Sequence, residues 1–234
     1  MNELFNFNQA ELQAIALSVK VAVYCAVISL PVALWLGYTM ARRNFYGKSV
    51  VEALIHLPLV MPPVTTGYLL LLLLGSKSFI GKWLFVTFGI KLAFTFPAAV
   101  IASVFVSFPL IVRSVRTSME MVDTGLEEAS RILGASKLKT FFRITIPLAL
   151  PGVVSGTILA FARSLGEFGA TITFAGNIAG ETQTLPLAIY SYMQVPGREG
   201  ATLRLVLVSV VISFIAMALS EWYIKKMKKD RGLT

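Results

Sequence analysis

Five long apolar runs divide this sequence. They lie at about 14–40, 50–74, 92–112, 146–163 and 203–224, and each is close to the ~20 residues that a helix needs to cross the hydrocarbon core of a bilayer. A backbone inside lipid must satisfy its own hydrogen bonds, which a helix does within one segment. We therefore expect an all-α protein, a polytopic membrane bundle of five transmembrane spans or six helical segments.

Prolines interrupt several of these runs. Pro58, Pro62 and Pro63 all fall within 50–74, and proline donates no N–H and clashes with the preceding turn of a helix. We expect a bent or broken helix there. Interrupted helices persist in lipid only where neighbouring helices or a wet cavity satisfy the freed backbone groups. The pattern therefore favours a bundle with a pathway over a simple anchor.

The distribution of basic residues predicts the orientation of the bundle. The chain is 56% hydrophobic, above the ~45–50% of soluble domains, and carries a net charge of +9. Fourteen of its 21 Lys and Arg residues fall after the first span, between the third and fourth, and after the last. The positive-inside rule then places the N-terminus outside and the C-terminus in the cytoplasm. The fourteen are Arg42, Arg43, Lys48, Arg113, Arg116, Arg131, Lys137, Lys139, Arg143, Lys225, Lys226, Lys228, Lys229 and Arg231.

The loops are short, and we expect one transmembrane domain over residues 1–234. No basic n-region precedes the first apolar run, whose first lysine is Lys20, so we expect this run to remain as a span rather than be cleaved as a signal peptide. The single Cys25 excludes an intrachain disulfide. The basic residues are not arranged as an aromatic-studded module, which argues against nucleic-acid binding.

The longest polar segment lies at about 115–145, and its second half falls within "EEASRILGASKLKTFFRITIP" at 127–147. Thr124 followed by Glu127 is a capping-box pattern that predicts a helix start. Gly134 is expected to stop or bend this helix, and a second short helix begins at about Ser136. Each helix has an apolar edge, made of Leu126, Ala129 and Leu133 in the first and of Leu138, Phe141 and Phe142 in the second.

Such an apolar edge, in a chain with little other cytoplasmic mass, needs a surface that covers it. The pattern alone leaves three candidates open. An interfacial helix can lie on the lipid headgroups, the edge can pack inside the chain's own bundle, or it can dock into a partner protein.

The spacing of particular residues in this segment resembles the EAA loop of the permease subunits of ABC importers. That loop has a glutamate-alanine-alanine start, a glycine six residues after the glutamate and a terminal isoleucine-x-leucine-proline. Two positions depart mildly, because a serine replaces the second alanine and an isoleucine the leucine. The matching residues are Glu128, Ala129, Ser130, Gly134, Ile144, Ile146 and Pro147.

The resemblance implies the type I ABC importer permease fold and a function for the loop. In that family the loop is a coupling helix that sits in a cleft of the cytoplasmic ATPase, so these residues, with Leu133 and Leu138, are expected to couple the permease to it. Glu128 either bonds within the loop or pairs with the ATPase. Gly134 is expected to permit a positive-φ turn or a close approach; as an incidental helix cap, its loss would lower stability rather than coupling.

Three other stretches are similar to molybdate permeases, with sulfate and tungstate permeases as close relatives. They are "SLGEFGATITFAGNIAGETQTLPLAIY" at 164–190, "HLPLVMPPVTTGY" at 56–68 and "IPLALPG" at 146–152. The resemblance implies import of molybdate, with tungstate often sharing the carrier, or else of sulfate. Residues 183–194 are apolar but too short to span, and we expect an outer-face helix there.

Candidate residues for an anion pathway follow from the chemistry of a tetrahedral oxyanion, which loses its water only where N–H and O–H donors replace it. Arg163 and Glu167 are one helical turn apart, and neither should face lipid. Arg163 either lines the pathway or forms a structural ion pair with Glu167. Glu52 lies four residues before His56, the single histidine, and is its candidate partner. The remaining pathway candidates are Ser164, Thr171, Asn177, Thr65 and Thr66.

Motifs for catalysis are lacking in the sequence. We find no GxxxxGK[ST] loop, paired carboxylates, metal-ligand cluster or GxSxG elbow, so we expect no catalytic residue, metal or cofactor in this chain. The resemblance implies a separate cytoplasmic ABC ATPase dimer, an extracytoplasmic molybdate-binding protein and a second copy of the permease. A secondary transporter or channel is the alternative from a different class, but it would want charged residues along several spans and leaves the loop unexplained.

Overall fold

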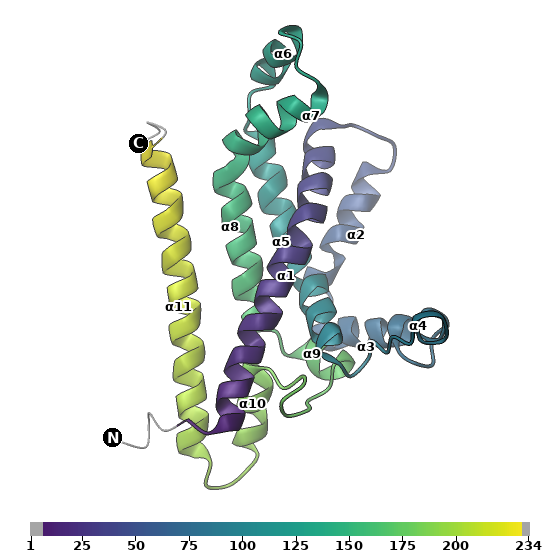
Figure 1. The fold of residues 1–234 in the computed structure, drawn as a ribbon, viewed down its shortest axis with the longest axis vertical. Coiled ribbons are helices and arrows are strands. Elements are labelled where there is room, and N and C mark those ends of the chain that lie inside the picture. The colour runs from purple at the N-terminus through teal and green to yellow at the C-terminus, as the bar shows by residue number, and fades with distance from the viewer. Residues whose placement is uncertain (1–6, 231–234) are drawn as a thin grey trace.

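The computed structural model describes residues 7–230 of the chain, and of residues 228–230 the backbone only. The basic residue Arg231, used above for the orientation, lies outside the described residues. Throughout the described part the regular structure is helical, which confirms the all-α membrane bundle (Figure 1). Four helical stretches are long and apolar enough to cross a membrane: α1 (Gln9–Arg42), α5 (Phe96–Glu120), the stretch Lys137–Leu165 that ends with α8 (Ile146–Leu165), and residues Glu199–Met227 of α11 (Glu199–Asp230).

The run at 50–74 is broken, as its prolines predict. It forms α2 (Lys48–Val60) and α3 (Pro63–Leu74), whose axes differ by 115°. The break falls where Pro62 caps α3 and Pro63 occupies its first turn, which needs no N–H donor. Counted as one bent span, the pair brings the number of spans in the described chain to five.

The centre of the bundle is formed by α1, α5 and α8, which approach one another closely through small residues. A Cβ added to Gly37 of α1 would lie 2.6 Å from Cγ1 of Val115 on α5, and one added to Gly156 of α8 would lie 2.7 Å from Cβ of Ser114. The Ser114 hydroxyl donates to the Gly152 carbonyl at 2.8 Å. Small residues four apart on facing helices are a common way for membrane helices to associate.

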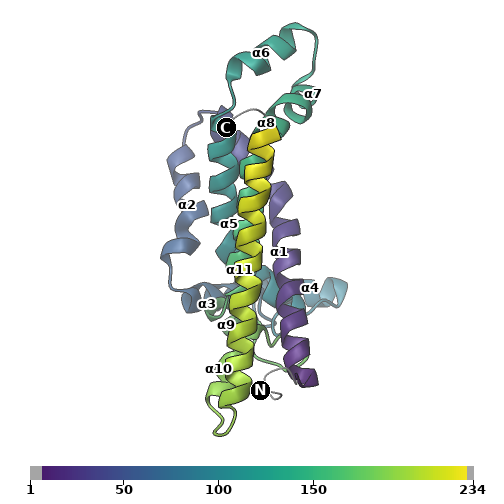
Figure 2. The ribbon, with the colours of Figure 1, turned by 90° about the vertical axis from the view of Figure 1, so that its left-hand side faces the viewer.

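The outermost spanning helix, α11, runs beside α8 with almost none of its apolar residues buried (Figures 1 and 2). At one end it is tied to α1, because Nη2 of Arg204 lies 2.9 Å from Oε1 of the fully buried Glu11. Glu11 also caps α1 reciprocally with Asn8. The long exposed apolar face of α11 is suited to lipid or to another transmembrane helix.

Three short helices lie toward the opposite end from the polar segment 115–145: α4 (Phe79–Phe88), α9 (Gly169–Phe174) and α10 (Leu185–Met193). The helix expected at 183–194 is α10. Two of the three stretches that are similar to molybdate permeases, 56–68 and 164–190, meet in space, because α9 packs on α3. A Cβ added to Gly67 would lie 2.6 Å from the Ala170 carbonyl oxygen, and one added to Gly169 would lie 2.7 Å from Cβ of Pro63.

Candidate functional site

The segment that contains the EAA-type spacing projects from one end of the bundle as two short helices, α6 (Thr124–Ile132) and α7 (Lys137–Thr140) (Figure 1). Helix α6 is capped by Asp123, whose carboxylate accepts from the Gly125 N–H at 2.8 Å. The prediction of Thr124 as the cap was therefore wrong by one residue, because the preceding aspartate provides the acceptor. The second helix begins where the sequence predicted, and the Ser136 hydroxyl caps it by accepting from the Lys139 N–H.

Gly134 connects the two helices with a φ of 87°, which confirms the positive-φ turn. A Cβ at this position would meet nothing within 4 Å. The backbone conformation, and not a close approach of another residue, is therefore what favours glycine here.

The sequence predicted a short second helix that is separate from the fourth span, but in the structure α7 does not end before that span. It continues through a π-helical turn, η2 (Phe141–Thr145), into α8, so that residues 137–165 form one continuous helical stretch. The Ile146 N–H bonds to the Phe141 carbonyl, five residues back. Pro147 has no N–H to donate, and its ring would clash with the carbonyl four residues earlier in a regular helix. A local π adjustment can satisfy the backbone groups that a proline leaves free in a membrane helix.

Glu127 anchors α6 to the bundle. One carboxylate oxygen lies 3.1 Å from Nη2 of Arg42, at the end of α1, and accepts from the Thr145 hydroxyl at 2.7 Å. Arg42 also donates to the Val122 carbonyl at 2.8 Å. The sequence reasoning missed this network, because its bonded pairs are up to 85 residues apart in the sequence and no local pattern pairs them.

The residues expected to couple to a partner are mostly exposed. Glu128 is exposed and forms no ion pair within the described residues. Ser130 is half-buried, with its hydroxyl 3.2 Å from that of Thr140. The apolar edge is not covered by the chain's own bundle: Leu133 is 87% exposed and Leu138 68%, which argues against the second of the three covers considered above. Ala129 and Pro147 are exposed, and Ile144 is half-buried.

Phe141 does not belong to this exposed edge. Its ring lies edge-on to that of Tyr38, with 4.9 Å between the centroids, and it packs against the core that α1, α5 and α8 share. The adjacent Phe142 remains 58% exposed.

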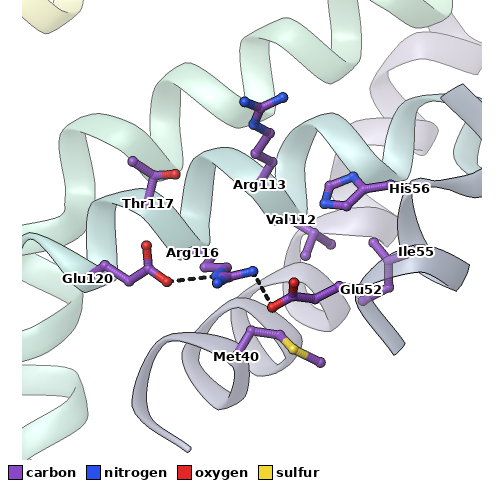
Figure 3. A pocket seen from close by; sticks show the side chains of 9 residues that line it. All are labelled: Met40, Glu52, Ile55, His56, Val112, Arg113, Arg116, Thr117 and Glu120. Carbon is purple, nitrogen blue, oxygen red and sulfur yellow. Dashed lines mark hydrogen bonds and ion pairs between the residues drawn. The ribbon is translucent and has the colours of Figure 1, made fainter. Parts of the chain in front are cut away.

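A second cluster of charged residues lies between α2 and α5, around a cavity of about 160 Å³ (Figure 3). Arg116 lies 2.5 Å from Glu52 on α2 and 2.7 Å from Glu120 on its own helix. Glu52 therefore pairs with Arg116 and not with His56, its expected partner. No residue of α2 is fully buried, so this ion pair is a main polar tie between α2 and the bundle.

The seven pathway candidates do not come together around one of the cavities described here. Arg163 and Glu167 form the expected ion pair at 2.9 Å, and the second carboxylate oxygen of the buried Glu167 accepts from the Ala170 N–H at the start of α9. Ser164, Thr171 and Thr66 are also buried, while Thr65 is exposed. Asn177 is exposed in the loop before α10, where it bonds to Ser191 and Gln183. Their role in a pathway stays a prediction.

Within residues 7–230 no three His, Cys, Asp or Glu side chains lie close enough to hold a metal ion. The geometry thus offers an exposed, hinged helical segment that is continuous with a membrane span and tied to a second span.

Solved structures with this fold include chains of ABC transporters. The chain superposes on one in a bacterial alginate ABC transporter with a TM-score of 0.75, at 15% identity and over 95% of this chain and 81% of that one. It superposes on one in the MetNI methionine ABC transporter with a TM-score of 0.69, at 19% identity and over 94% of both chains. The type I ABC importer permease fold is confirmed.

Residues 30–229 match the sequence profile of the binding-protein-dependent transport system inner membrane components. The chain belongs to this family and is a multi-pass inner membrane protein. It is 54% identical to the molybdenum transport system permease protein ModB of Haemophilus influenzae, over 95% of this chain and 97% of that protein. The ModB of Escherichia coli K12 is 47% identical over the same shares. A probable sulfate transport system permease of Chlorokybus atmophyticus is 35% identical over 86% of this chain and 72% of that protein.

Proposed function

We propose that this chain is the permease subunit of an ATP-driven importer that moves molybdate, and with it tungstate, into the cytoplasm by alternating access. The observation that carries the proposal is the 54% identity to a molybdenum permease over nearly the full length of both chains. The ATPase activity belongs to a separate subunit, since the sequence has no Walker loop.

The coupling loop, at about 115–145, docks into a cytoplasmic ATPase dimer, and each of two permease copies contributes one loop. The exposed apolar residues Leu133 and Leu138 supply the buried part of this contact, and Glu128 supplies a charge that forms no ion pair with the other side chains described in the structure. Because α7 continues into α8, a displacement of the loop reaches the membrane as a rigid movement of a span. The loop lies on the cytoplasmic side, with the N-terminus outside, as the distribution of basic residues predicts.

A second copy of the chain completes the transport pathway. Support comes from the exposed apolar faces of α2 and α11, which the bundle itself does not cover. Arg163, whose side chain is 32% exposed, and the exposed Thr65 are the candidates that can face such a pathway directly. The buried Ser164, Glu167, Thr171 and Thr66 support the walls, and Asn177 lies near the outer mouth, where an extracytoplasmic binding protein delivers the anion.

Uptake of labelled molybdate tests this function. Vesicles would contain the permease with its ATPase and binding protein, and unlabelled tungstate or sulfate would compete. We expect ATP-dependent uptake that tungstate suppresses and sulfate does not. Strong competition by sulfate would favour the second candidate, a sulfate importer, which the 35% identical sulfate relative supports. Uptake without ATP or partners would contradict the importer proposal.

The role of Glu128 is tested by Glu128→Gln, with Glu181→Gln as the control on an exposed loop of the opposite end. We expect the Glu128 variant to insert and fold normally but to lose about tenfold in ATP-driven uptake, which corresponds to the loss of ~1.4 kcal/mol of coupling. Normal uptake by this variant would remove Glu128 from the coupling contact.

A further inference from the structure

A groove of about 620 Å³ lies between the C-terminal part of α1 and the coupling loop. Its lining changes character along α1. Pro31, Leu34 and Trp35 line one part of it, and Arg42 and Arg43 line the other. From Pro31 to Arg42 the helix rises about 17 Å, so the apolar part lies well inside the ~30 Å hydrocarbon core when the arginines are at its edge.

The other part of the groove is positively charged. Four basic and two acidic residues line it, which leaves two positive charges in excess. Arg42 is paired with Glu127, as described above. The side chains of Arg43, Arg131 and Lys137 form no ion pair within the described residues and are exposed.

The depth and charge of the groove restrict what can fill it. A water-soluble protein or a free anion can reach the arginines but not the membrane-embedded surface around Trp35, which is 66% exposed. A second copy of the chain would bring another strongly basic end against this one, which is unfavourable electrostatically. A phospholipid supplies both an acyl chain and, if it is anionic, a net negative headgroup.

We propose that this groove binds one anionic phospholipid. Its phosphate lies against Arg43, Arg131 and Lys137, and an acyl chain lies along Pro31, Leu34 and Trp35. Basic pockets between transmembrane helices bind acidic headgroups in this manner. Because Arg43 follows directly at the C-terminal cap of α1 and the other two cations belong to the coupling loop, the lipid bridges the end of a membrane span to the loop. The site rests on the membrane-spanning fold and not on the identity of the transported anion.

Native mass spectrometry of the purified chain, titrated with phosphatidylglycerol or phosphatidylcholine, tests the site. We expect the anionic lipid to be retained roughly tenfold more strongly, which corresponds to ~1.4 kcal/mol, because its net negative headgroup is attracted by the three cations. The double variant Arg43→Gln/Lys137→Gln should lose this preference. The matched control, Lys225→Gln/Lys226→Gln, removes two charges from the basic end of α11 and should keep it.

Two further measurements separate the lipid from other occupants. Trp35→Ala should weaken retention of both lipids, and soluble glycerol 1-phosphate should compete poorly because it lacks the acyl chain. The proposal is overturned if the groove and control variants retain phosphatidylglycerol equally, if glycerol phosphate competes as well as the lipid, or if the groove variants change the oligomeric state instead. Thermal unfolding of each variant checks that the fold is retained.

Discussion

At the scale of single residues, Gly134 separates a backbone requirement from a functional one. Its φ of 87° disfavours any side chain, and Gly197 in the turn before α11 has a similar φ of 83° with equally open space around it. Gly134→Ala and Gly197→Ala should therefore destabilise the fold to a similar extent, about 1 kcal/mol. Only Gly134→Ala should lower ATP-driven uptake, because only it redirects α7 relative to α6.

The measurement combines thermal unfolding in detergent with uptake in vesicles. Equal loss of uptake in both glycine variants would mean that Gly134 is an ordinary helix end and that its conformation has no special part in coupling.

The Glu52–Arg116 pair makes a second prediction for individual side chains. Both side chains are about 30% exposed, so the pair contributes no more than ~1 kcal/mol, but it ties α2 to α5. Arg116→Glu places three carboxylates together and should lower both the thermal stability and the uptake. The swap Glu52→Arg/Arg116→Glu restores opposite charges and should recover most of the loss. A swap that is no better than the single variant would show that the pair has no role in holding α2.

At the scale of helices, the contact between α5 and α8 depends on the absence of side chains. A Cβ on Gly156 would lie 2.7 Å from Cβ of Ser114, and such overpacking destabilises by ~1–3 kcal/mol. In an open helical position the same change is favourable by up to ~1 kcal/mol. We therefore expect Gly156→Ala to lower the unfolding temperature and Gly200→Ala, which meets nothing within 4 Å, to leave it unchanged or raise it.

A rescue variant completes this comparison. Ser114→Gly removes the Cβ that Gly156→Ala would meet, so the double variant should recover part of the lost stability. An unchanged unfolding temperature for Gly156→Ala alone would contradict the close packing of the two helices.

Helices were predicted well where one local signal decides them. The prolines predicted the break between α2 and α3, and Gly134 and Ser136 predicted the boundary between α6 and α7. The cap of α6 was misplaced because Asp123 and Thr124 are both good capping residues and only the backbone distinguishes them. The continuity of α7 with α8 was missed because Pro147 normally ends a helix, and the π turn that accommodates it has no sequence signature.

At the scale of the whole molecule, the proposed orientation predicts which loops a reagent can reach. The variant Cys25→Ser removes the single native thiol, which is fully buried and reacts poorly with a reagent in water. In that background, Met193→Cys on α10 should react with a membrane-impermeant maleimide in intact cells, and Tyr46→Cys between α1 and α2 only after permeabilisation. Both side chains are well exposed. The reverse pattern of labelling would show that the orientation is the opposite of the proposed one, with the coupling loop on the outside, where no ATP is available.

Contacts across the molecule were the part that the sequence did not reveal. The motif spacing identified Glu128, but Glu127, next to it, is the residue bound to Arg42 and Thr145. Glu52 was assigned to His56, one turn along its own helix, whereas its partner is 64 residues away. Ion pairs of this kind depend on how helices cross, which periodicity and capping patterns do not encode.

The ion pairs at the two ends of α1 have a consequence for the order of biosynthesis. Glu11 pairs with Arg204, and Arg42 with Glu127, so the partners of this early helix are translated 193 and 85 residues later. While the chain emerges from the ribosome, α1 therefore enters the membrane with both of these charges uncompensated. We expect it to remain beside the insertion machinery until α11 arrives, which makes completion of the last helix the step that releases the first.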